Sequence, residues 1–66
     1  MGLIINGETR AFAAPMTLAQ LVETLSLVGK RIAIERNGEI VPRSQYAETQ
    51  LADQDRLEIV VAVGGG

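Results

Sequence analysis

Short apolar runs alternate with turn-forming pairs along the chain, and they predict a sheet. Leu3-Ile4-Ile5 is followed by Asn6-Gly7 and then by a mixed run that reaches Phe12. An Asn-Gly pair between strand-like runs is typical of a type I′ hairpin, because both central residues need positive φ and these two types tolerate it best. The pattern predicts strands over residues 2–6 and 8–13 joined by a tight turn.

One stretch has helical spacing instead. Its apolar residues recur at i, i+3, i+4 and i+7: Leu18, Leu21, Val22 and Leu25. Thr17 is a good N-cap, and Gln20 three residues later completes a capping box. Gly29 suits the left-handed position after a helix, and Lys30 then lies at the negative helix end. We expect one amphipathic helix over this stretch, with its leucine stripe in the core.

A second Asn-Gly pair predicts a second hairpin. Asn37-Gly38 separates Ile32–Arg36 from Glu39–Val41, and Pro42 ends the latter strand because proline has no N–H for a ladder. Residues 44–48 are expected to form a single helical turn with Tyr46 packed inward.

The last strand is expected over residues 56–63, after a turn at residues 53–55. One set of alternating residues is apolar, namely Leu57, Ile59, Val61 and Val63, and the other set is Arg56, Glu58, Val60 and Ala62. The element order predicts an α+β fold with a mixed four- to five-stranded sheet and one main helix across one face. The β-grasp (ubiquitin-like) arrangement fits best, with residues 1–63 as a single domain and 64–66 as a flexible glycine tail.

Composition removes many kinds of chemistry. The 66 residues include 8 acidic and 6 basic side chains, for a net charge of −2, and neither cysteine nor histidine. Disulfides, thiolate nucleophiles, imidazole bases and Cys- or His-based zinc sites are therefore excluded. Asp53 and Asp55 alone make an incomplete metal site, so no metal is expected. So small a domain fits a binding module or carrier better than an enzyme.

Partners and location are bounded in the same way. The chain has no basic run, and Phe12 and Tyr46 are its only aromatic residues, which argues against nucleic acid. Its longest apolar stretch, residues 59–63, has the length of a strand rather than a membrane span. We expect a cytoplasmic protein that binds no membrane.

The chain as given ends in Gly64-Gly65-Gly66, directly after the last predicted strand. On the glycines alone, an unimportant chain end and a functional tail both remain open. A tail without side chains can thread a narrow channel into another protein's active site. Adenylation by ATP would turn its terminal carboxylate into a mixed anhydride, and a sulfur nucleophile would then displace AMP to leave a thiocarboxylate. Such a protein needs no catalytic side chain of its own.

The sequence also resembles the thiamin-biosynthesis sulfur carrier family, which is ubiquitin-like. The matching positions are Ile34–Arg43, Tyr46, Leu51, Asp53, Asp55, Leu57–Ile59 and Ala62–Gly66. The resemblance covers the whole chain and is most specific from Ile34 onward, where Val41-Pro42-Arg43 combines with the glycine ending.

The resemblance implies a protein co-substrate with no bound cofactor. Gly66, preceded by Gly64 and Gly65, would be adenylated by a ubiquitin-activating-like enzyme that uses ATP, and would then become a thiocarboxylate. The sulfur would come from a persulfide derived from cysteine by a desulfurase, and thiazole synthase would accept it. The family usually has two terminal glycines, so the third changes the reach by roughly 3.3–3.6 Å. The family often has glycine where Gln54 stands here, and Gln54 would be strained at positive φ.

Three other roles remain open. A molybdopterin synthase small subunit is similar but usually longer, a ubiquitin-like modifier would form isopeptide bonds, and a plain interaction domain would have an inert tail. Val60 and Ala62 are candidate partner-binding residues, because they lie opposite the predicted core face of the last strand. Arg43 is a further candidate contact for an acidic partner.

Overall fold

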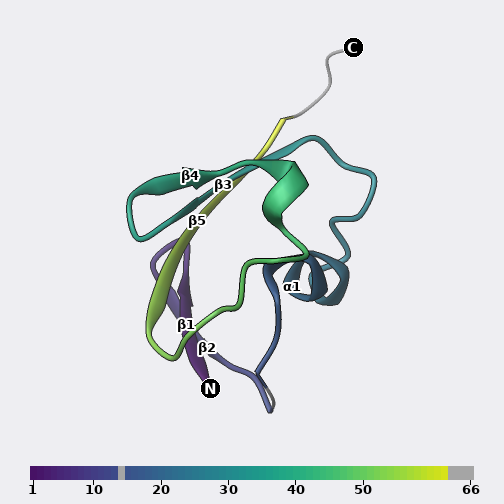
Figure 1. Ribbon diagram of the computed structural model, residues 1–66. Coiled ribbons are helices and arrows are strands. Elements are labelled where there is room, and N and C mark those ends of the chain that lie inside the picture. The colour runs from purple at the N-terminus through teal and green to yellow at the C-terminus, as the bar shows by residue number, and fades with distance from the viewer. Residues whose placement is uncertain (14, 63–66) are drawn as a thin grey trace.

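Five strands form one mixed sheet with the last strand at its centre. The computed structural model describes residues 1–13 and 15–62. Its elements are β1 (Gly2–Ile5), β2 (Glu8–Ala11), α1 (Leu18–Thr24), β3 (Ile32–Arg36), β4 (Glu39–Val41), the 3₁₀ helix η1 (Arg43–Gln45) and β5 (Asp55–Val61). The strand order is β2-β1-β5-β3-β4 (Figure 1). β5 pairs in parallel with β1 and antiparallel with β3.

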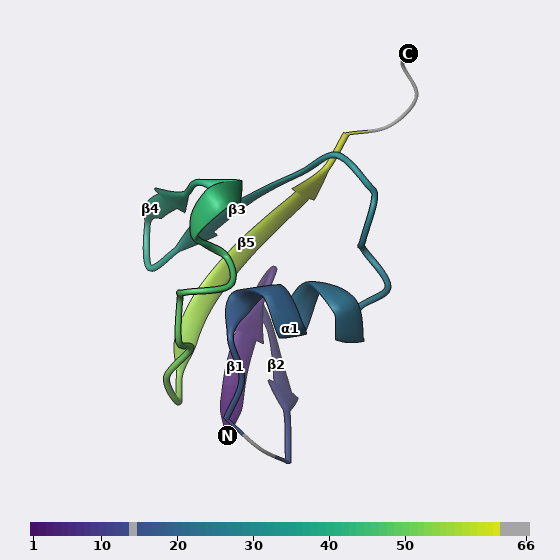
Figure 2. The same ribbon diagram turned by 45° about the vertical axis from the view of Figure 1, so that its right-hand side comes forward.

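The helix lies across one face of this sheet (Figure 2). The core between these layers contains Leu3, Ile5, Leu18, Leu21, Val22, Ile34, Tyr46, Leu51, Leu57 and Ile59. The five fully covered side chains come from β1, α1, β3 and β5, so every layer contributes to one core. This arrangement is the predicted α+β, β-grasp fold, with five strands and one main helix.

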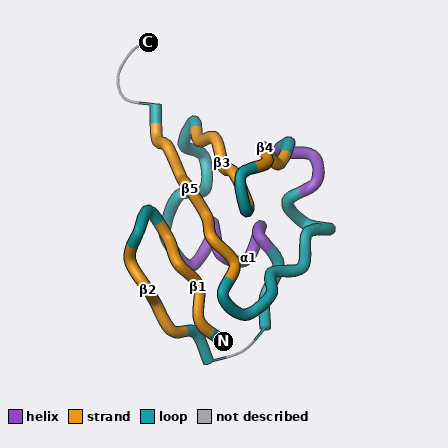
Figure 3. Tube along the Cα trace, turned by 90° about the vertical axis from the view of Figure 1, so that its left-hand side faces the viewer, coloured by secondary structure: helices purple, strands orange, loops and turns teal. Residues whose placement is uncertain are grey.

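Both Asn-Gly turns have the predicted conformation. Asn6 and Gly7 have φ of 50° and 83°, and Asn37 and Gly38 have φ of 51° and 88°. The two turns close the β1–β2 and β3–β4 hairpins, which flank β5 on either side (Figure 3).

The Asn6 side chain also extends the β1–β5 ladder. Its backbone N–H donates to the Leu57 carbonyl over 2.9 Å, as the next rung of the ladder should. Beyond that point its amide replaces the backbone: Oδ1 accepts from the Ile59 N–H at 2.7 Å, and Nδ2 donates to the Ile59 carbonyl at 3.1 Å. Asn6 therefore closes the turn and prolongs the pairing of the central strand.

Asn37 does the same on the other side of β5. Its backbone N–H donates to the Arg56 carbonyl, and its Oδ1 accepts from the Arg56 N–H at 2.9 Å. Its Nδ2 donates to Oδ1 of Asp55 at 3.0 Å. Oδ2 of that carboxylate accepts from Arg36 Nε and from the Ala52 N–H, both at 2.8 Å. A buried carboxylate thus joins the β3–β4 turn to the start of β5.

The predicted start of α1 is confirmed. Thr17 and Gln20 form the capping box in both directions. Two further backbone N–H groups of the first turn are bonded to the segment before β5: Leu18 donates to the Thr49 carbonyl, and Ala19 donates to the Tyr46 carbonyl. The first turn of the helix is therefore attached to the η1–β5 connection.

The predicted helix end is wrong. The helix stops at Thr24, and Ser26 rather than Gly29 takes the left-handed position, with φ of 60°. The Leu27 N–H donates to the Val22 carbonyl and the Ser26 N–H to the Glu23 carbonyl, which is the Schellman pattern. These bonds satisfy the last carbonyls of the helix early. Gly29, with φ of 82°, then lies in a separate turn closed by the Lys30 N–H and the Leu27 carbonyl.

Smaller differences occur at strand ends. β2 stops at Ala11, and β5 begins at Asp55. Val61 lies on the apolar side of β5 but is 38% exposed, because this end of the strand extends beyond α1 (Figure 2). Gln54 has φ of 70°, the strained conformation considered for it, and its N–H donates to the Gly2 carbonyl. η1 starts one residue before the predicted turn, and Tyr46 is buried as expected.

Within the described ranges, no helix has both the length and the apolar character needed to cross a bilayer.

The Asn6 amide gives a first prediction. Asn6→Asp keeps a residue that tolerates positive φ but places a carboxylate oxygen against the Ile59 carbonyl in place of a donor. We expect the free energy of unfolding to fall by about 1–3 kcal/mol, the usual cost of an unpaired, partly buried polar group. Urea denaturation measures it. Asn6→Gly is the control, since it keeps the turn and removes the amide; wild-type stability of Asn6→Asp would show that the amide bonds are unimportant.

Asp55 gives a second prediction, on pH. Burial alone would raise the pKa of its carboxyl, but the hydrogen bonds from Ala52, Asn37 and Arg36 and the Arg36 charge together hold that pKa below its ordinary value of 3.8. The folded pKa is depressed, so its stabilisation is present above about pH 4 and is lost as pH falls through the folded value.

We therefore expect Asp55→Asn to lower the free energy of unfolding by about 2 kcal/mol at pH 7, and by much less near pH 2. Urea denaturation of both proteins across this range measures the difference. Asp53→Asn is the matched control, because Asp53 accepts only from the Gly2 N–H at an exposed position. A difference that does not change with pH would contradict this role of the carboxylate.

Candidate functional site

The predicted reactive residues continue from β5, whose C-terminal end is at the margin of the domain (Figure 1). Gly64, Gly65 and Gly66, together with Val63, lie outside the described residues. The last described residue is Ala62, which is exposed and whose N–H donates to the Arg31 carbonyl at 2.9 Å. This bond holds Ala62 next to the segment that precedes β3.

Val60 lies on the sheet face away from α1. It is 64% exposed and pairs across the ladder with Ala33 of β3, which is also exposed. Ile40 of β4 is 71% exposed and belongs to the same face, because it pairs with Glu35, and Glu35 pairs with Glu58. We call Val60, Ala33 and Ile40 the open sheet patch.

Sequence reasoning identified Val60 and Ala62 but not the other two members of the open sheet patch. The alternation of β5 pointed to its own residues, whereas Ala33 and Ile40 join them only through the strand order. The β3–β5 register would have been the signal for Ala33, and the β3–β4 register is needed in addition for Ile40.

Arg43 does not belong to the open sheet patch. It begins η1, is exposed, and donates from Nη2 to the Lys30 carbonyl at 3.1 Å. Ala62 is bonded to the carbonyl of the next residue, Arg31. One short segment before β3 therefore carries both contacts, which places Arg43 near the C-terminal end of β5 but on the helix side of the sheet.

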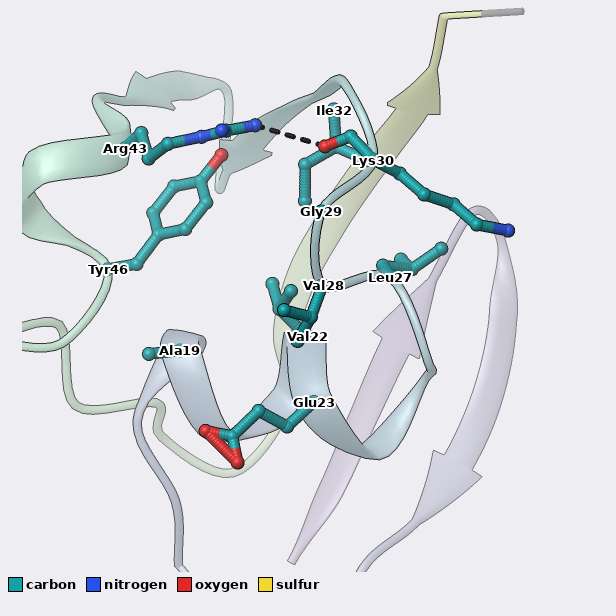
Figure 4. Close-up of a pocket in the computed structure, with 10 residues that line it drawn as sticks. All are labelled: Ala19, Val22, Glu23, Leu27, Val28, Gly29, Lys30, Ile32, Arg43 and Tyr46. Carbon is teal, nitrogen blue, oxygen red and sulfur yellow. Dashed lines mark hydrogen bonds between the residues drawn. The ribbon is translucent and has the colours of Figure 1, made fainter.

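A cavity of about 250 Å³ opens on this helix side (Figure 4). It lies between α1, the segment before β3, and η1. Its apolar lining includes Val22 and Ile32, and Val28 at its edge is 66% exposed. Figure 4 shows Arg43 and the ring of Tyr46 on one side of the cavity and Glu23 at the other end. Sequence analysis missed it because its walls come from three separate segments.

The described residues offer little acid–base or metal chemistry. Among them, no three carboxylates lie together in a way that could hold a metal ion. The carboxyl of Asp55 has a lowered pKa, but its bonds to Arg36, Asn37 and Ala52 make it a structural group.

The β-grasp fold of this chain, with glycines that follow the last strand in the sequence, is that of a ubiquitin-like protein. The ThiS family model matches residues 3–66, and the chain belongs to this family.

Known proteins with similar sequences carry related names. The chain is 50% identical over 66 residues to a thiazole synthase of Paramagnetospirillum magneticum, of which it spans only 20% of the length. It is 30% identical over 66 residues to the sulfur carrier protein ThiS of Escherichia coli, with all of both chains covered. Identity to the Bacillus subtilis sulfur carrier protein ThiS is 42% over 50 residues, or 76% of each chain.

A solved structure supports the same family. The crystal structure of the thiamine biosynthesis protein ThiS from Geobacter metallireducens superposes with a TM-score of 0.84, at 28% identity and with both chains fully covered. The predicted resemblance to the sulfur carrier family is therefore confirmed.

Proposed function

We propose that this protein is the sulfur carrier of thiamin thiazole synthesis and acts as a co-substrate rather than an enzyme. The observation that carries the proposal is the match of the ThiS family model through residue 66, which includes the glycine segment. The reactive group is the carboxylate of Gly66, which Gly64 and Gly65 precede in the sequence.

The chemistry takes place in a partner's active site. A carboxylate oxygen of Gly66 attacks the α-phosphorus of ATP and releases pyrophosphate, which gives an acyl adenylate. A persulfide from a cysteine desulfurase attacks the carbonyl and displaces AMP. A thiol then cleaves the S–S bond, is oxidised to a disulfide, and leaves a thiocarboxylate. The ubiquitin-activating-like enzyme binds and uses the ATP, and the carrier itself needs no cofactor. We expect this to happen in the cytoplasm, where ATP and the persulfide are made.

Thiazole synthase is the proposed sulfur acceptor. A relative named thiazole synthase contains a region 50% identical to this entire chain, and a second, from Magnetococcus marinus, is 35% identical over the same 66 residues. In those proteins the carrier-like region and the rest of the polypeptide are one molecule. That arrangement supports an encounter between the two partners when they are separate proteins.

The open sheet patch is the proposed docking surface for the adenylating enzyme. Val60 is 64% exposed and lies two residues before Ala62, where the described chain ends, so a partner that covers this patch is close to the C-terminal end of β5. Apolar side chains exposed together on a sheet are typical of protein interfaces.

Intact-protein mass spectrometry tests the proposed chemistry. The protein is incubated with ATP, a cognate adenylating enzyme and a persulfide source, next to a variant that lacks residues 64–66. We expect a mass gain equal to replacement of one oxygen by sulfur, and no gain in the variant. Absence of both adenylate and thiocarboxylate, with an enzyme that loads a known carrier, would refute the proposal.

The docking surface is tested by Val60→Asp. Burying a carboxylate against an apolar partner surface is unfavourable, so we expect affinity for the adenylating enzyme to fall about tenfold or more. Isothermal titration calorimetry measures it. Thr9→Asp is the matched control, because Thr9 is exposed on the same sheet face through its pairing with Ile4 but lies on the edge strand β2. Equal affinities of wild type and Val60→Asp would remove the open sheet patch from the interface.

A further inference from the structure

Two carboxylates lie among the apolar residues of the open sheet patch. Glu35 of β3 and Glu58 of β5 are both exposed and pair directly across the β3–β5 ladder. Ala33 and Val60 form the next pair on the same face. Ile40 of β4 pairs with Glu35 from the other side. A partner that covers the open sheet patch therefore also covers both carboxylates.

The described part of the domain does not neutralise this carboxylate pair. Its one salt bridge joins Arg36 to Asp55, so neither Glu35 nor Glu58 takes part in one. Arg56 belongs to the same face, because it is two residues before Glu58 on β5, and it makes no salt bridge either. Like charges directly opposite each other on neighbouring strands destabilise a sheet. The pair is thus unfavourable for the isolated domain.

The chemistry of a partner surface decides whether the pair becomes favourable on binding. An uncharged apolar surface would remove water from both carboxylates and leave them unpaired, which is strongly unfavourable. Cβ atoms of directly opposite residues are about 4.5–5.5 Å apart. One guanidinium, with five N–H donors in a planar fork, can therefore donate to both carboxylates. The surface that complements this face is a cation flanked by apolar side chains.

We propose that the open sheet patch docks a protein surface that places an arginine side chain between Glu35 and Glu58, with apolar contacts to Val60 and Ile40. This inference deepens the proposed function and rests on it for the existence of such a partner. It adds the chemistry of the partner surface and makes the carboxylate pair the specificity determinant of the patch.

The sign of one effect tests this proposal. Glu35→Gln/Glu58→Gln removes both charges and keeps the size of both side chains. Opposite a cation, we expect affinity to fall about tenfold or more at low salt, and the loss to shrink as salt screens the charges. Opposite an uncharged surface, affinity would rise instead, because amides are easier to desolvate than carboxylates. Unchanged or higher affinity in isothermal titration calorimetry would overturn the proposal.

Val60→Asp identifies the partner with which this comparison is made. The unloaded carrier is titrated with a cognate adenylating enzyme, which the proposed function places here, and in parallel with a cognate thiazole synthase. The partner that loses affinity for Val60→Asp is then used for the glutamine variant. If neither loses affinity, no such partner covers this face and the proposal fails. A wild-type dimer in sedimentation velocity that Val60→Asp dissociates would also overturn it.

Glu8→Gln/Glu48→Gln is the matched control, because it makes the same change of net charge at exposed positions away from this face. Glu8 pairs with the core residue Ile5 and so belongs to the helix side of the sheet, and Glu48 lies between η1 and β5. Its affinity should stay within twofold of wild type, and a loss equal to that of Glu35→Gln/Glu58→Gln would refute a local role of the pair. Thermal melts should show the latter variant to be at least as stable as wild type, since it removes a repulsion.

These titrations do not depend on sulfur loading, so failure of this inference and failure of the proposed function are distinguishable. If the wild-type protein forms no thiocarboxylate in the mass measurement, the proposed function fails whatever the affinities are. If the thiocarboxylate forms and Glu35→Gln/Glu58→Gln binds as well as wild type, only the cationic partner surface is refuted.

Discussion

The pairing of β5 on both of its edges is the constraint on which the rest of the structure depends. β1 and β3 have no contact as neighbours in the sheet and are joined only through β5. The Asn6 and Asn37 amides strengthen this arrangement, because each adds hydrogen bonds to β5 beyond the point where the flanking strand ends. The core and the position of the chain after Val61 both follow from where β5 lies.

This arrangement explains how so small a domain can offer two different surfaces at one end. β5 carries buried residues toward α1 and exposed ones toward the opposite face, so the open sheet patch and the helix-side cavity lie on different sides of one strand. The carbonyls of Lys30 and Arg31 accept hydrogen bonds from Arg43 at the cavity and from Ala62 after β5, so the cavity and Ala62 lie close together.

Local signals in the sequence predicted local structure well. The turns predicted at Asn6-Gly7 and Asn37-Gly38 were correct because a type I′ turn depends on two adjacent residues. The helix start was correct for the same reason, since the capping box lies within four residues. The predicted helix end was wrong because Ser26 takes the left-handed conformation that glycine normally takes. Backbone hydrogen bonds from Ser26 and Leu27 to the last turn of the helix stabilise this conformation.

Features that depend on distant segments could not be predicted in this way. Alternation in β5 indicated which residues share a face, but not that β5 would extend beyond α1 and leave Val61 partly exposed. The helix-side cavity depends on α1, η1 and the segment before β3 coming together, and no short pattern encodes that. The proposed role of Gly66 rests on the resemblance to a family, because glycines alone are compatible with an inert end.

The topology also determines the order in which the domain can fold. Each Asn-Gly hairpin closes over a few residues and can form in about 1–10 μs. β5 joins these hairpins later in folding, because Leu3 pairs with Asp55, which is 52 positions away in the sequence. Bringing such distant segments together costs loop-closure entropy before any contact compensates for it, so this step should limit the folding rate. Until it occurs, the inner edges of β1 and β3 are unpaired, and the transient state in which they are exposed is the one most prone to aggregate.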